Sequence, residues 1–500
     1  MQQEEVKEIQ EAAPPKKNSD QNNYKNILKR ISAFGGVQIF GILINLIRGK
    51  FVAILLGPEG MGLSSMLTSS TNTVQQLASL GLNLAMVKEV AAEKEKGEKM
   101  PLIFAVTIRL IYFTAILGCI VTLLFSPLLS LWSFGSYDYT LGFAILSAGV
   151  ALSVAGTGYL ALLQGMGEVK RLAWSSVAGG LAGLLFGVPL YYFFGLNGIV
   201  PALLIYALTV FLFYFFTFQR SVAVDKAKFV WSESKPLVKK LISLGIVLMI
   251  GSLVGTLTNY LINIFIRAVG SLDDVGLFQA ANSLTNQYVG IVFSALAMDY
   301  FPRLSSVASD KSKMRDVVNR QMEIVLVIVT PLILALQLFA PLIVDILLSK
   351  EFLGIVPLIR WLAFGVLLQG ITFPMGYIFV AMNNKRVYVW MEVVFTNVLW
   401  IVCSIVFYYY FSLIGLGVSL VVRVGIDIFV TYFVCRQFYD FRLEYKVGMK
   451  ILCCLLLGLS GFIASLLPDS PAFYCLIAIL VISCIFSLLT LRKGLRSNIR

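Results

Sequence analysis

The 500-residue sequence contains no histidine, and only 13% of its residues are charged. The absence of imidazole excludes histidine metal ligands, histidine general bases and HExxH chemistry. A soluble globular chain is about a quarter charged, so this chain has too few charges to cover a water-facing surface of its size. Hydrophobic residues make up 58% of the chain, and the mean hydropathy is +0.85. The composition therefore predicts a polytopic membrane protein.

Apolar stretches of about 20 residues recur along the chain, and each is long enough to cross a hydrocarbon core of about 30 Å as a helix. We therefore predict an all-α fold with about 14 transmembrane helices. The predicted spans are 32–56, 62–86, 103–127, 141–164, 172–194, 198–219, 241–267, 275–299, 323–348, 357–381, 387–411, 413–435, 447–467 and 471–491.

The basic residues are distributed very unevenly among the segments between these spans. If the amino terminus is cytoplasmic, the cytoplasmic segments together with Lys450 hold 33 of the 40 Lys and Arg residues. The positive-inside rule therefore predicts that both termini are cytoplasmic. It also explains the net charge of +13 by topology, so we expect no nucleic-acid partner. The polar residues 1–30 resemble a solvated cytoplasmic tail and lack the apolar region of a signal peptide.

Two parts of the sequence share one layout, which indicates an internal repeat. Residues 29–72 and 240–286 each hold an apolar span with a cation toward its outer end, Arg48 or Arg267, followed by a Gly- and acid-rich loop. The loops are GPEGMGL (57–63) and GSLDDVGL (270–277). Since six helices return the chain to its starting side, two such units run in the same sense, as in parallel-repeat transporters. We predict a first lobe over 31–219, a linker over 220–240, a second lobe over 241–435 and a hairpin over 447–491.

Polar side chains follow one face of the first two helices in each predicted repeat. Matching stripes of this kind predict a water-filled cleft between the two lobes, whereas the alternative is that the amides only hold helices together. The predicted lining is Gln38, Asn45, Asn72, Gln75, Asn259, Asn263, Gln279, Asn282 and Asn286.

Ionisable side chains at bilayer depth are costly, so they usually face a cavity or a partner. The cations Arg48, Arg267, Arg360 and Arg423 predict an anionic substrate, because guanidinium binds phosphate in a bidentate manner and stays charged. Arg267 and Arg360 lie near the outer boundary, where a long side chain can instead reach the interface. Arg423 precedes Asp427 by four residues and can pair with it. The acids that could couple transport to an ion gradient are Asp299, Asp345, Glu392 and Asp427.

The run LINLIRGKFVAILLGPEGMGLSSML (43–67), followed by LASLGLNLAMVKEVA (77–91), resembles the amino-terminal signature of Wzx-type O-antigen and polysaccharide flippases. These belong to the multidrug/oligosaccharidyl-lipid/polysaccharide (MOP) exporter superfamily. The DYFPRLS run (299–305) is similar to the segment that closes the second helix of each MOP repeat.

The resemblance implies two six-helix lobes of the MOP and MATE type around a central cavity, and a transporter rather than an enzyme. It implies a substrate of undecaprenyl-diphosphate-linked oligosaccharide, moved from the cytoplasmic to the periplasmic leaflet of the bacterial inner membrane. We expect a monomer without cofactor or metal, and leave open whether a polysaccharide polymerase is a partner. Two alternatives stay open, a lipid II flippase, since that subfamily also has fourteen spans, and a multidrug or metabolite extruder of the same superfamily.

Overall fold

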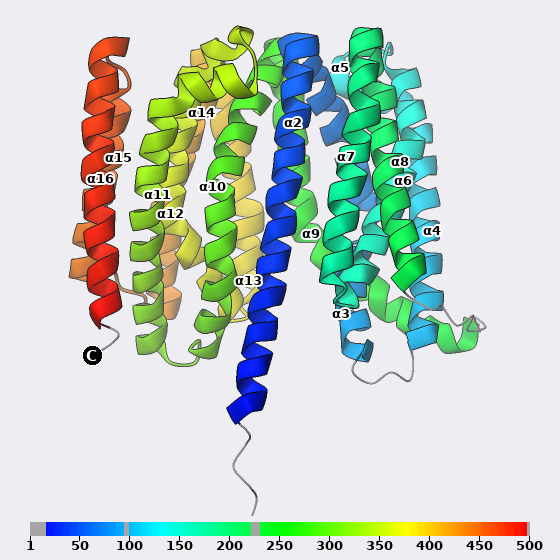
Figure 1. Cartoon of the computed structure of the whole chain (residues 1–500), viewed down its shortest axis with the longest axis horizontal. Coiled ribbons are helices and arrows are strands. Elements are labelled where there is room, and N and C mark those ends of the chain that lie inside the picture. Colours follow the sequence, from blue (N-terminus) through cyan, green and yellow to red (C-terminus); the bar gives the residue numbers. More distant parts are fainter. Residues whose placement is uncertain (1–16, 95–99, 222–230, 498–500) are drawn as a thin grey trace, which may run out of the picture.

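The computed structural model of the chain describes residues 17–94, 100–221 and 231–497, without the side chains at 17–39, 231–233, 287, 469–470 and 494–497. Every secondary-structure element in these ranges is helical, and the long helices run roughly side by side (Figure 1). The long helices are α2 (Lys17–Ala78), α3 (Leu82–Lys94), α4 (Met100–Leu124), α6 (Thr140–Gly165), α7 (Val169–Phe194), α8 (Ile199–Ser221), α9 (Trp231–Val269), α10 (Leu272–Ser306), α11 (Lys311–Leu347), α12 (Val356–Ala381), α14 (Thr396–Tyr439), α15 (Tyr445–Ala464) and α16 (Asp469–Ser497). The short ones are α5 (Ser126–Phe134), η1 (Gly195–Gly198), η2 (Lys350–Ile355), α13 (Lys385–Tyr388) and the π-helix η3 (Val389–Phe395).

In the described part of the chain, 10 continuous helical stretches are long and apolar enough to cross a membrane. Two of these stretches, Val169–Ser221 and Lys385–Tyr439, each contain two of the predicted spans, and Phe40–Ala78 covers most of two more, 32–56 and 62–86. The more polar α10 supplies the one predicted span that is missing from the ten. The prediction of an all-α, multi-pass membrane protein with about fourteen spans is therefore confirmed. Of the predicted tail, residues 1–16 lie outside the described residues, and α2 begins at Lys17.

Two of the double stretches change direction at a residue with a positive φ. The backbone of α2 leaves the helical conformation at Gly57 (φ 65°), and that of α14 does so at Ser412 (φ 50°). In a continuous helix, Asn45 and Thr68 would be about 35 Å apart at 1.5 Å per residue. Instead they line the same cavity, so the two limbs of α2 lie side by side. Glycine suits this turn because it has no β-carbon to clash at positive φ.

The apolar interior is divided between two clusters of buried side chains. The first is built from both limbs of α2 and from α3 to α8, with Phe143 and Tyr159 among its largest members. The second is built mainly from α10 to α15. Helix α9 contributes to both, because Leu241 packs in the first cluster and Ile262 and Ile266 pack in the second. The two halves of the molecule are therefore joined along α9.

A reciprocal contact between the two repeats supports the predicted parallel arrangement. Gly62 and Gly276 hold matching positions in the two loop segments. A β-carbon on Gly62 would lie 2.0 Å from the carbonyl oxygen of Leu272, and one on Gly276 would lie 2.0 Å from that of Pro58. Pro58 and Leu272 are each four residues before their glycine, so each repeat makes the same contact with the other. Such mutual contact is what a two-fold axis between two similar halves produces.

Helices α15 and α16 form a hairpin at one edge of the bundle, beside α11 (Figure 1). Lys450 Nζ of α15 donates to Glu323 Oε1 of α11 at 2.5 Å, and Ser487 Oγ of α16 donates to the Val327 carbonyl at 2.6 Å. These bonds attach the hairpin to the second cluster of helices.

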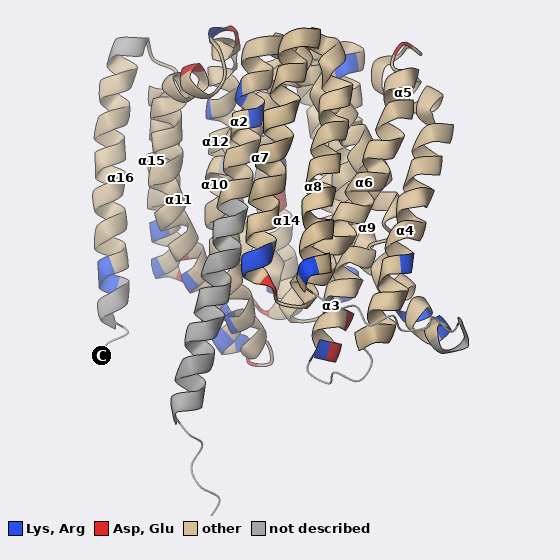
Figure 2. Cartoon of the chain, turned by 45° about the vertical axis from the view of Figure 1, so that its right-hand side comes forward, with Lys and Arg blue, Asp and Glu red and all other residues tan. Residues whose placement is uncertain are grey.

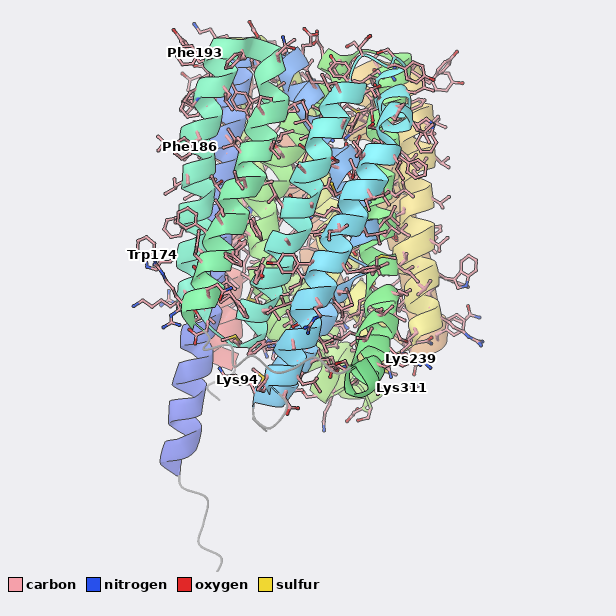
Figure 3. All side chains as sticks on the ribbon, turned by 90° about the vertical axis from the view of Figure 1, so that its right-hand side faces the viewer. Lys94, Trp174, Phe186, Phe193, Lys239 and Lys311 are labelled. Carbon is pink, nitrogen blue, oxygen red and sulfur yellow. The ribbon has the colours of Figure 1, made fainter. Side chains whose placement is uncertain are left out.

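Lysine and arginine residues gather toward the end of the bundle that carries the C-terminus (Figure 2). We call this the basic end; Lys94, Lys239 and Lys311 mark it in Figure 3. Acidic residues occur at both ends, including the opposite end, where the two loop segments of the repeats lie. Basic residues are therefore concentrated toward one end of the helix axes, as the sequence pattern predicts.

Candidate substrate cavity

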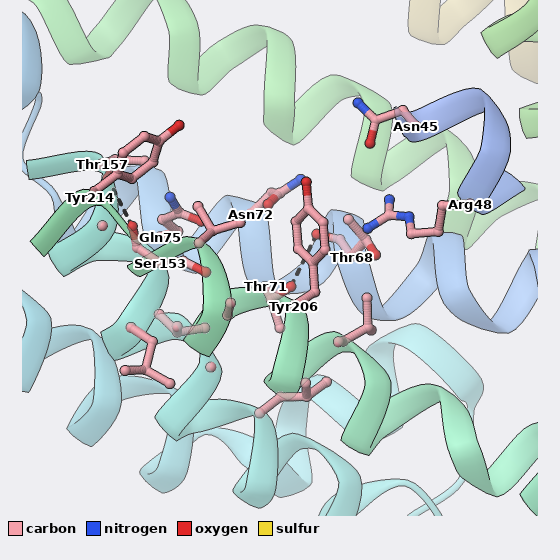
Figure 4. Close-up of a pocket in the computed structure, with 18 residues that line it drawn as sticks. Asn45, Arg48, Thr68, Thr71, Asn72, Gln75, Ser153, Thr157, Tyr206 and Tyr214 are labelled. Carbon is pink, nitrogen blue, oxygen red and sulfur yellow. Dashed lines mark hydrogen bonds between the residues drawn. The ribbon is translucent and has the colours of Figure 1, made fainter. Parts of the chain in front are cut away.

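A polar cavity of about 290 Å³ lies within the first half of the molecule, between the two limbs of α2 and helices α6 and α8 (Figure 4). The α2 limbs supply its polar wall, while α6 and α8 supply a mixed wall that includes Ser153, Thr157, Tyr206 and Tyr214. The α2 residues in the wall are Asn45, Arg48, Thr68, Thr71, Asn72 and Gln75. Three of the residues predicted to line a cleft, Asn45, Asn72 and Gln75, are therefore brought together here with Arg48.

A second cavity, of about 360 Å³, adjoins the first and shares Asn45, Arg48, Thr68 and Asn72 with it. Its other wall comes from the second repeat, through residues of α9 and α10. These residues are Asn259, Asn263, Gln279 and Ser283. The two cavities together form a cleft lined by both repeats, which we call the central cleft.

Arg48 is the arginine that faces the central cleft. Its guanidinium carbon lies 5.1 Å from the centre of the Tyr206 ring, an arrangement in which the ring face attracts the cation. Among the described residues, no carboxylate forms an ion pair with Arg48. The cation is therefore oriented by an aromatic ring while its hydrogen-bond donors stay available to an anion.

Hydrogen bonds between amides and a hydroxyl join the two repeats across the cleft. Gln279 Nε2 donates to Asn263 Oδ1 at 2.7 Å, and Asn263 Nδ2 donates to Ser69 Oγ at 3.4 Å. Asn263 is only 1% exposed, so its amide serves this connection more than it serves the open part of the cleft. Asn259 Nδ2 donates to the Gly255 carbonyl of its own helix at 3.0 Å.

Two further predicted lining residues, Asn282 and Asn286, lie away from both cavities. Asn286 Nδ2 donates to Asn282 Oδ1 at 2.7 Å, one helical turn apart on α10, and neither residue lines the two cavities. The side chain of Gln38 lies outside the described residues.

The other three arginines bind elsewhere in the fold. Arg267 Nε donates to the Ser133 carbonyl of α5 at 2.9 Å, so it links α9 to the first half of the molecule. Arg360 Nη1 donates to the Ser465 carbonyl at the end of α15 at 2.7 Å. Arg423 is 8% exposed and lies over the Trp400 ring at 5.2 Å. In this arrangement the central cleft holds none of the three.

The predicted acids also divide into two groups. Asp427 and Glu392 lie inside the second half, within electrostatic range of Arg423, although Asp427 accepts from Thr431 Oγ1 at 3.1 Å and forms no ion pair with Arg423. Asp299 instead pairs with Arg303 at 3.1 Å on an exposed face, and Asp345 is exposed. The interior therefore places the ionisable side chains of Glu392, Arg423 and Asp427 near one another.

Sequence reasoning did not identify the lining contributed by α6 and α8. Ser153 and Thr157 are one turn apart, which is a polar signal, but a single pair of hydroxyls is common in membrane helices and is usually satisfied by the helix backbone. Thr157 indeed donates to the Ser153 carbonyl at 3.0 Å. Tyr206 and Tyr214 are two turns apart in a span rich in aromatic residues, where a cavity-facing tyrosine resembles a lipid-facing one.

Comparison with known proteins agrees with this architecture. Residues 51–357 match the family described as polysaccharide biosynthesis protein. The lipid III flippase of Escherichia coli (strain K12) is 25% identical over 356 residues, which cover 70% of this chain and 83% of that protein. It is therefore similar to the chain over most of its own length.

Two solved structures share the fold at 16% identity. A structure of the lipid II flippase MurJ in an inward closed conformation has a TM-score of 0.69 and covers 95% of this chain and 100% of its own. An inward-facing multidrug resistance MATE family transporter of the MOP superfamily has a TM-score of 0.67 and covers 84% and 98%. The lipid III flippase is a transporter, in agreement with the prediction that the chain is not an enzyme. The chain belongs to the polysaccharide biosynthesis protein family and has the fold of the MOP superfamily.

Proposed function

We propose that the chain is a flippase for an oligosaccharide linked to undecaprenyl diphosphate, the repeat unit of an O-antigen or a related surface polysaccharide. The observation that carries this proposal is Arg48, a cation without an ion-pair partner among the described residues, in a polar cleft lined by both repeats. Membership in the polysaccharide biosynthesis protein family and the similarity to a lipid III flippase support the same substrate class.

The positive charge of Arg48 suits the diphosphate, which is the part of the substrate that is most costly to move through hydrocarbon. An arginine at the centre of a membrane span costs about 2.5–3.5 kcal/mol on insertion scales. Arg48 lies nearer the outer end of its span, so its cost is at most this, but a cation inside a span without an ion-pair partner still indicates a function. A diphosphate brought to the same depth carries the opposite charge, and each group lowers the cost of burying the other. The guanidinium offers planar, paired donors that match phosphate oxygens. Tyr206 keeps those donors turned toward the cleft.

The remaining lining suits the sugars. Thr68, Thr71, Asn72, Gln75 and Ser153 bring hydroxyl and amide groups to the cleft, and such groups replace the water that sugar hydroxyls lose. The polyprenyl tail remains in the lipid between the two halves. Transport from the cytoplasmic to the periplasmic leaflet then requires the two halves to rock, so that the cleft opens to one side at a time.

Arg267, Arg360 and Arg423 belong to the proposal as residues that join the cleft in another conformation. Coupling to an ion gradient is proposed for Glu392 and Asp427, whose carboxylates lie close to Arg423. The chain acts in the bacterial inner membrane with both termini cytoplasmic, as a monomer, on a substrate that a polysaccharide polymerase consumes.

The two alternatives differ in the substrate. A lipid II flippase would carry the same diphosphate, so the glycan distinguishes the two. A multidrug extruder for cationic compounds requires carboxylates in the cleft, whereas the two cavities described here contain Arg48 and no acidic side chain.

The test is deletion of the chain from its host, followed by mass spectrometry of the lipid-linked oligosaccharides on each leaflet. We expect a surface-polysaccharide unit on undecaprenyl diphosphate to accumulate on the cytoplasmic leaflet. Complementation with the wild-type chain and with Arg436→Ala, an exposed cation outside the cavities, should clear it. Complementation with the Arg48→Ala variant should leave the unit accumulated on the cytoplasmic leaflet.

Two results would contradict the proposal. Accumulation of lipid II would assign the chain to cell-wall synthesis, and unchanged lipid-linked pools with increased drug sensitivity would assign it to drug export. Proposed ion coupling has its own test in proteoliposomes, since substrate flipping that continues without any ion gradient excludes it.

A further inference from the structure

A third cavity lies on the outer wall of the first half, away from the central cleft. It has a volume of about 610 Å³ and is lined by the first turns of α7 and the last turns of α8. Its residues are Lys170, Arg171, Trp174, Ser175, Ala178, Phe213, Thr217 and Arg220. Since α7 begins at Val169 and α8 ends at Ser221, this groove opens at the basic end, where the membrane surface is expected.

The charge of the groove is positive. Lys170, Arg171 and Arg220 are all exposed, and no acidic side chain lines the groove. The acid next to it is Glu168, whose Oε2 lies 3.8 Å from Arg171 Nε. The groove therefore keeps an excess of positive charge at the depth at which lipid phosphates lie.

Apolar rings continue the groove into the membrane. Trp174 is one helical turn beyond Lys170 and is 69% exposed, and Phe213 of α8 is 39% exposed. Trp174, Phe186 and Phe193 project outward from α7 along its length (Figure 3). A cationic rim with an apolar wall above it matches a lipid, whose phosphate lies at the interface and whose chains lie in the hydrocarbon.

The positive-inside rule by itself places cations at this end but does not place three of them around one hollow. Lys385, Arg386 and Arg436 are just as exposed, in or near α13 and at the end of α14, and they line none of the three cavities described above. In the groove, the floor is a hydrogen bond of 2.6 Å between Ser175 Oγ and Thr217 Oγ1. Helices α7 and α8 therefore hold the three backbone positions that carry these cations around one hollow.

The same packing separates the groove from the central cleft. Above the floor, the Ser176 and Tyr214 hydroxyls are hydrogen-bonded at 2.9 Å. At the next two turns, a β-carbon on Gly179 would lie 3.0 Å from Val210 Cα, and one on Gly183 would lie 2.5 Å from the Tyr206 ring. Helices in such close contact leave no passage for a diphosphate and its sugars, so a ligand in the groove remains on the outer wall.

We propose that this groove binds the phosphate of an anionic phospholipid from the leaflet at the basic end, as a resident lipid distinct from the transported substrate. Lys170, Arg171 and Arg220 bind the phosphate oxygens, and Trp174 and Phe213 pack against the glycerol and the upper acyl chain. The site does not depend on the proposed flippase function.

The experiment measures lipid binding to the purified full-length chain in detergent by native mass spectrometry. Anionic phosphatidylglycerol is the probe, and zwitterionic phosphatidylethanolamine is the control lipid. Each basic residue near an anionic lipid contributes about fivefold to binding, so we expect the triple variant Lys170→Gln/Arg171→Gln/Arg220→Gln to weaken the tightest phosphatidylglycerol site by about 100-fold. The single variant Arg220→Gln should weaken it by about fivefold, which keeps the test available if the triple variant does not insert.

The control variant removes the same charge at the same end. Lys385→Gln/Arg386→Gln/Arg436→Gln should leave the tightest site within about threefold of wild type. The proposal is overturned if the groove variants bind phosphatidylglycerol as tightly as this control, or if phosphatidylethanolamine occupies the site equally well. It is also overturned if undecaprenyl diphosphate displaces phosphatidylglycerol at equal concentration, because the groove would then bind the transported lipid during its passage.

Discussion

Replacing Gly276 with alanine should separate the two repeats at the end of the molecule opposite the basic end. The new β-carbon would lie 2.0 Å from the Pro58 carbonyl oxygen and 2.8 Å from the Gly62 nitrogen, and both of these are backbone atoms. No side-chain rotation relieves such a clash, so α10 and the second limb of α2 have to move apart.

The size of the effect follows from the contact distance. A carbon atom and a carbonyl oxygen approach to about 3.3 Å, so the two backbones must separate by about 1.3 Å. Overpacking of this kind costs about 1–3 kcal/mol, which corresponds to about 5- to 150-fold in the equilibrium between conformations that keep the contact and conformations that lack it. Gly62→Ala should behave alike, because its β-carbon would meet the Leu272 carbonyl at the same distance. The double variant should cost less than the sum, since one separation relieves both clashes.

Spin labels provide the assay. Cysteines replacing Asp138 and Lys350, exposed residues of the opposite end in different halves, report the distance between the halves by double electron–electron resonance. The exposed native cysteines Cys475 and Cys484 are changed to serine in this background.

The control for this assay is Gly290→Ala in the same helix α10, where a β-carbon meets no atom within 4 Å. We expect Gly276→Ala to move the distance distribution to longer values and Gly290→Ala to leave it unchanged. Identical distributions for Gly276→Ala and its parent would refute the reasoning and show that the reciprocal contact does not hold the halves together.

Four further outcomes are expected. Arg48→Ala should slow substrate flipping in proteoliposomes about 10- to 150-fold, the value of a hydrogen bond to a charged group, and Arg48→Lys should recover part of it. Tyr206→Leu should weaken substrate binding by about 0.5–2 kcal/mol, whereas Tyr206→Phe, which keeps the ring beneath Arg48, should bind like wild type. Glu323→Gln should lower the stability of the hairpin by no more than about 1 kcal/mol in thermal unfolding, because its Lys450 partner is 39% exposed. Hydrogen bonds from the backbone N–H groups of Lys313 and Ser312 lower the pKa of the Asp310 carboxyl at the start of α11. The cap is therefore fully formed above the ordinary pKa of Asp and is lost as the pH falls through the lowered pKa. Amide hydrogen exchange in the first turn of α11 should then rise in acid, and Asp310→Asn should remove this pH dependence.

The helical plan was predictable from the sequence because it depends on local quantities. A span needs about 20 apolar residues, and the predicted spans fall on helical segments, including 275–299 within α10 despite its polar content. The predicted span 62–86 extends past the end of α2 across the turn into α3. The turns between limbs were also predictable from local sequence, since Gly57 lies between two apolar runs where the chain has to reverse. The repeat was detectable because GPEGMGL and GSLDDVGL preserve the glycines that the close contact between the halves requires.

The central cleft was only partly predictable. The amide stripes of α2, α9 and α10 indicated which helices face one another, and Asn45, Asn72, Gln75, Asn259, Asn263 and Gln279 all line it. The periodicity of a single helix does not reveal which other helices complete the wall. The contributions of α6 and α8 depend on contacts between residues far apart in the sequence, and Tyr206 lies 158 positions after Arg48.

The two arginines at matching repeat positions, Arg48 and Arg267, show most clearly what the sequence alone could not predict. By itself it determined that the chain crosses the membrane many times, that two halves repeat, and that Arg48 and Arg267 hold matching places near the outer ends of matching helices. The tertiary structure alone decided their different roles. Helix α5 of the first half brings the Ser133 carbonyl to Arg267, whereas Arg48 meets the face of Tyr206 and open space. A guanidinium binds the acceptor that the fold brings to it, and that acceptor belongs to a distant part of the chain.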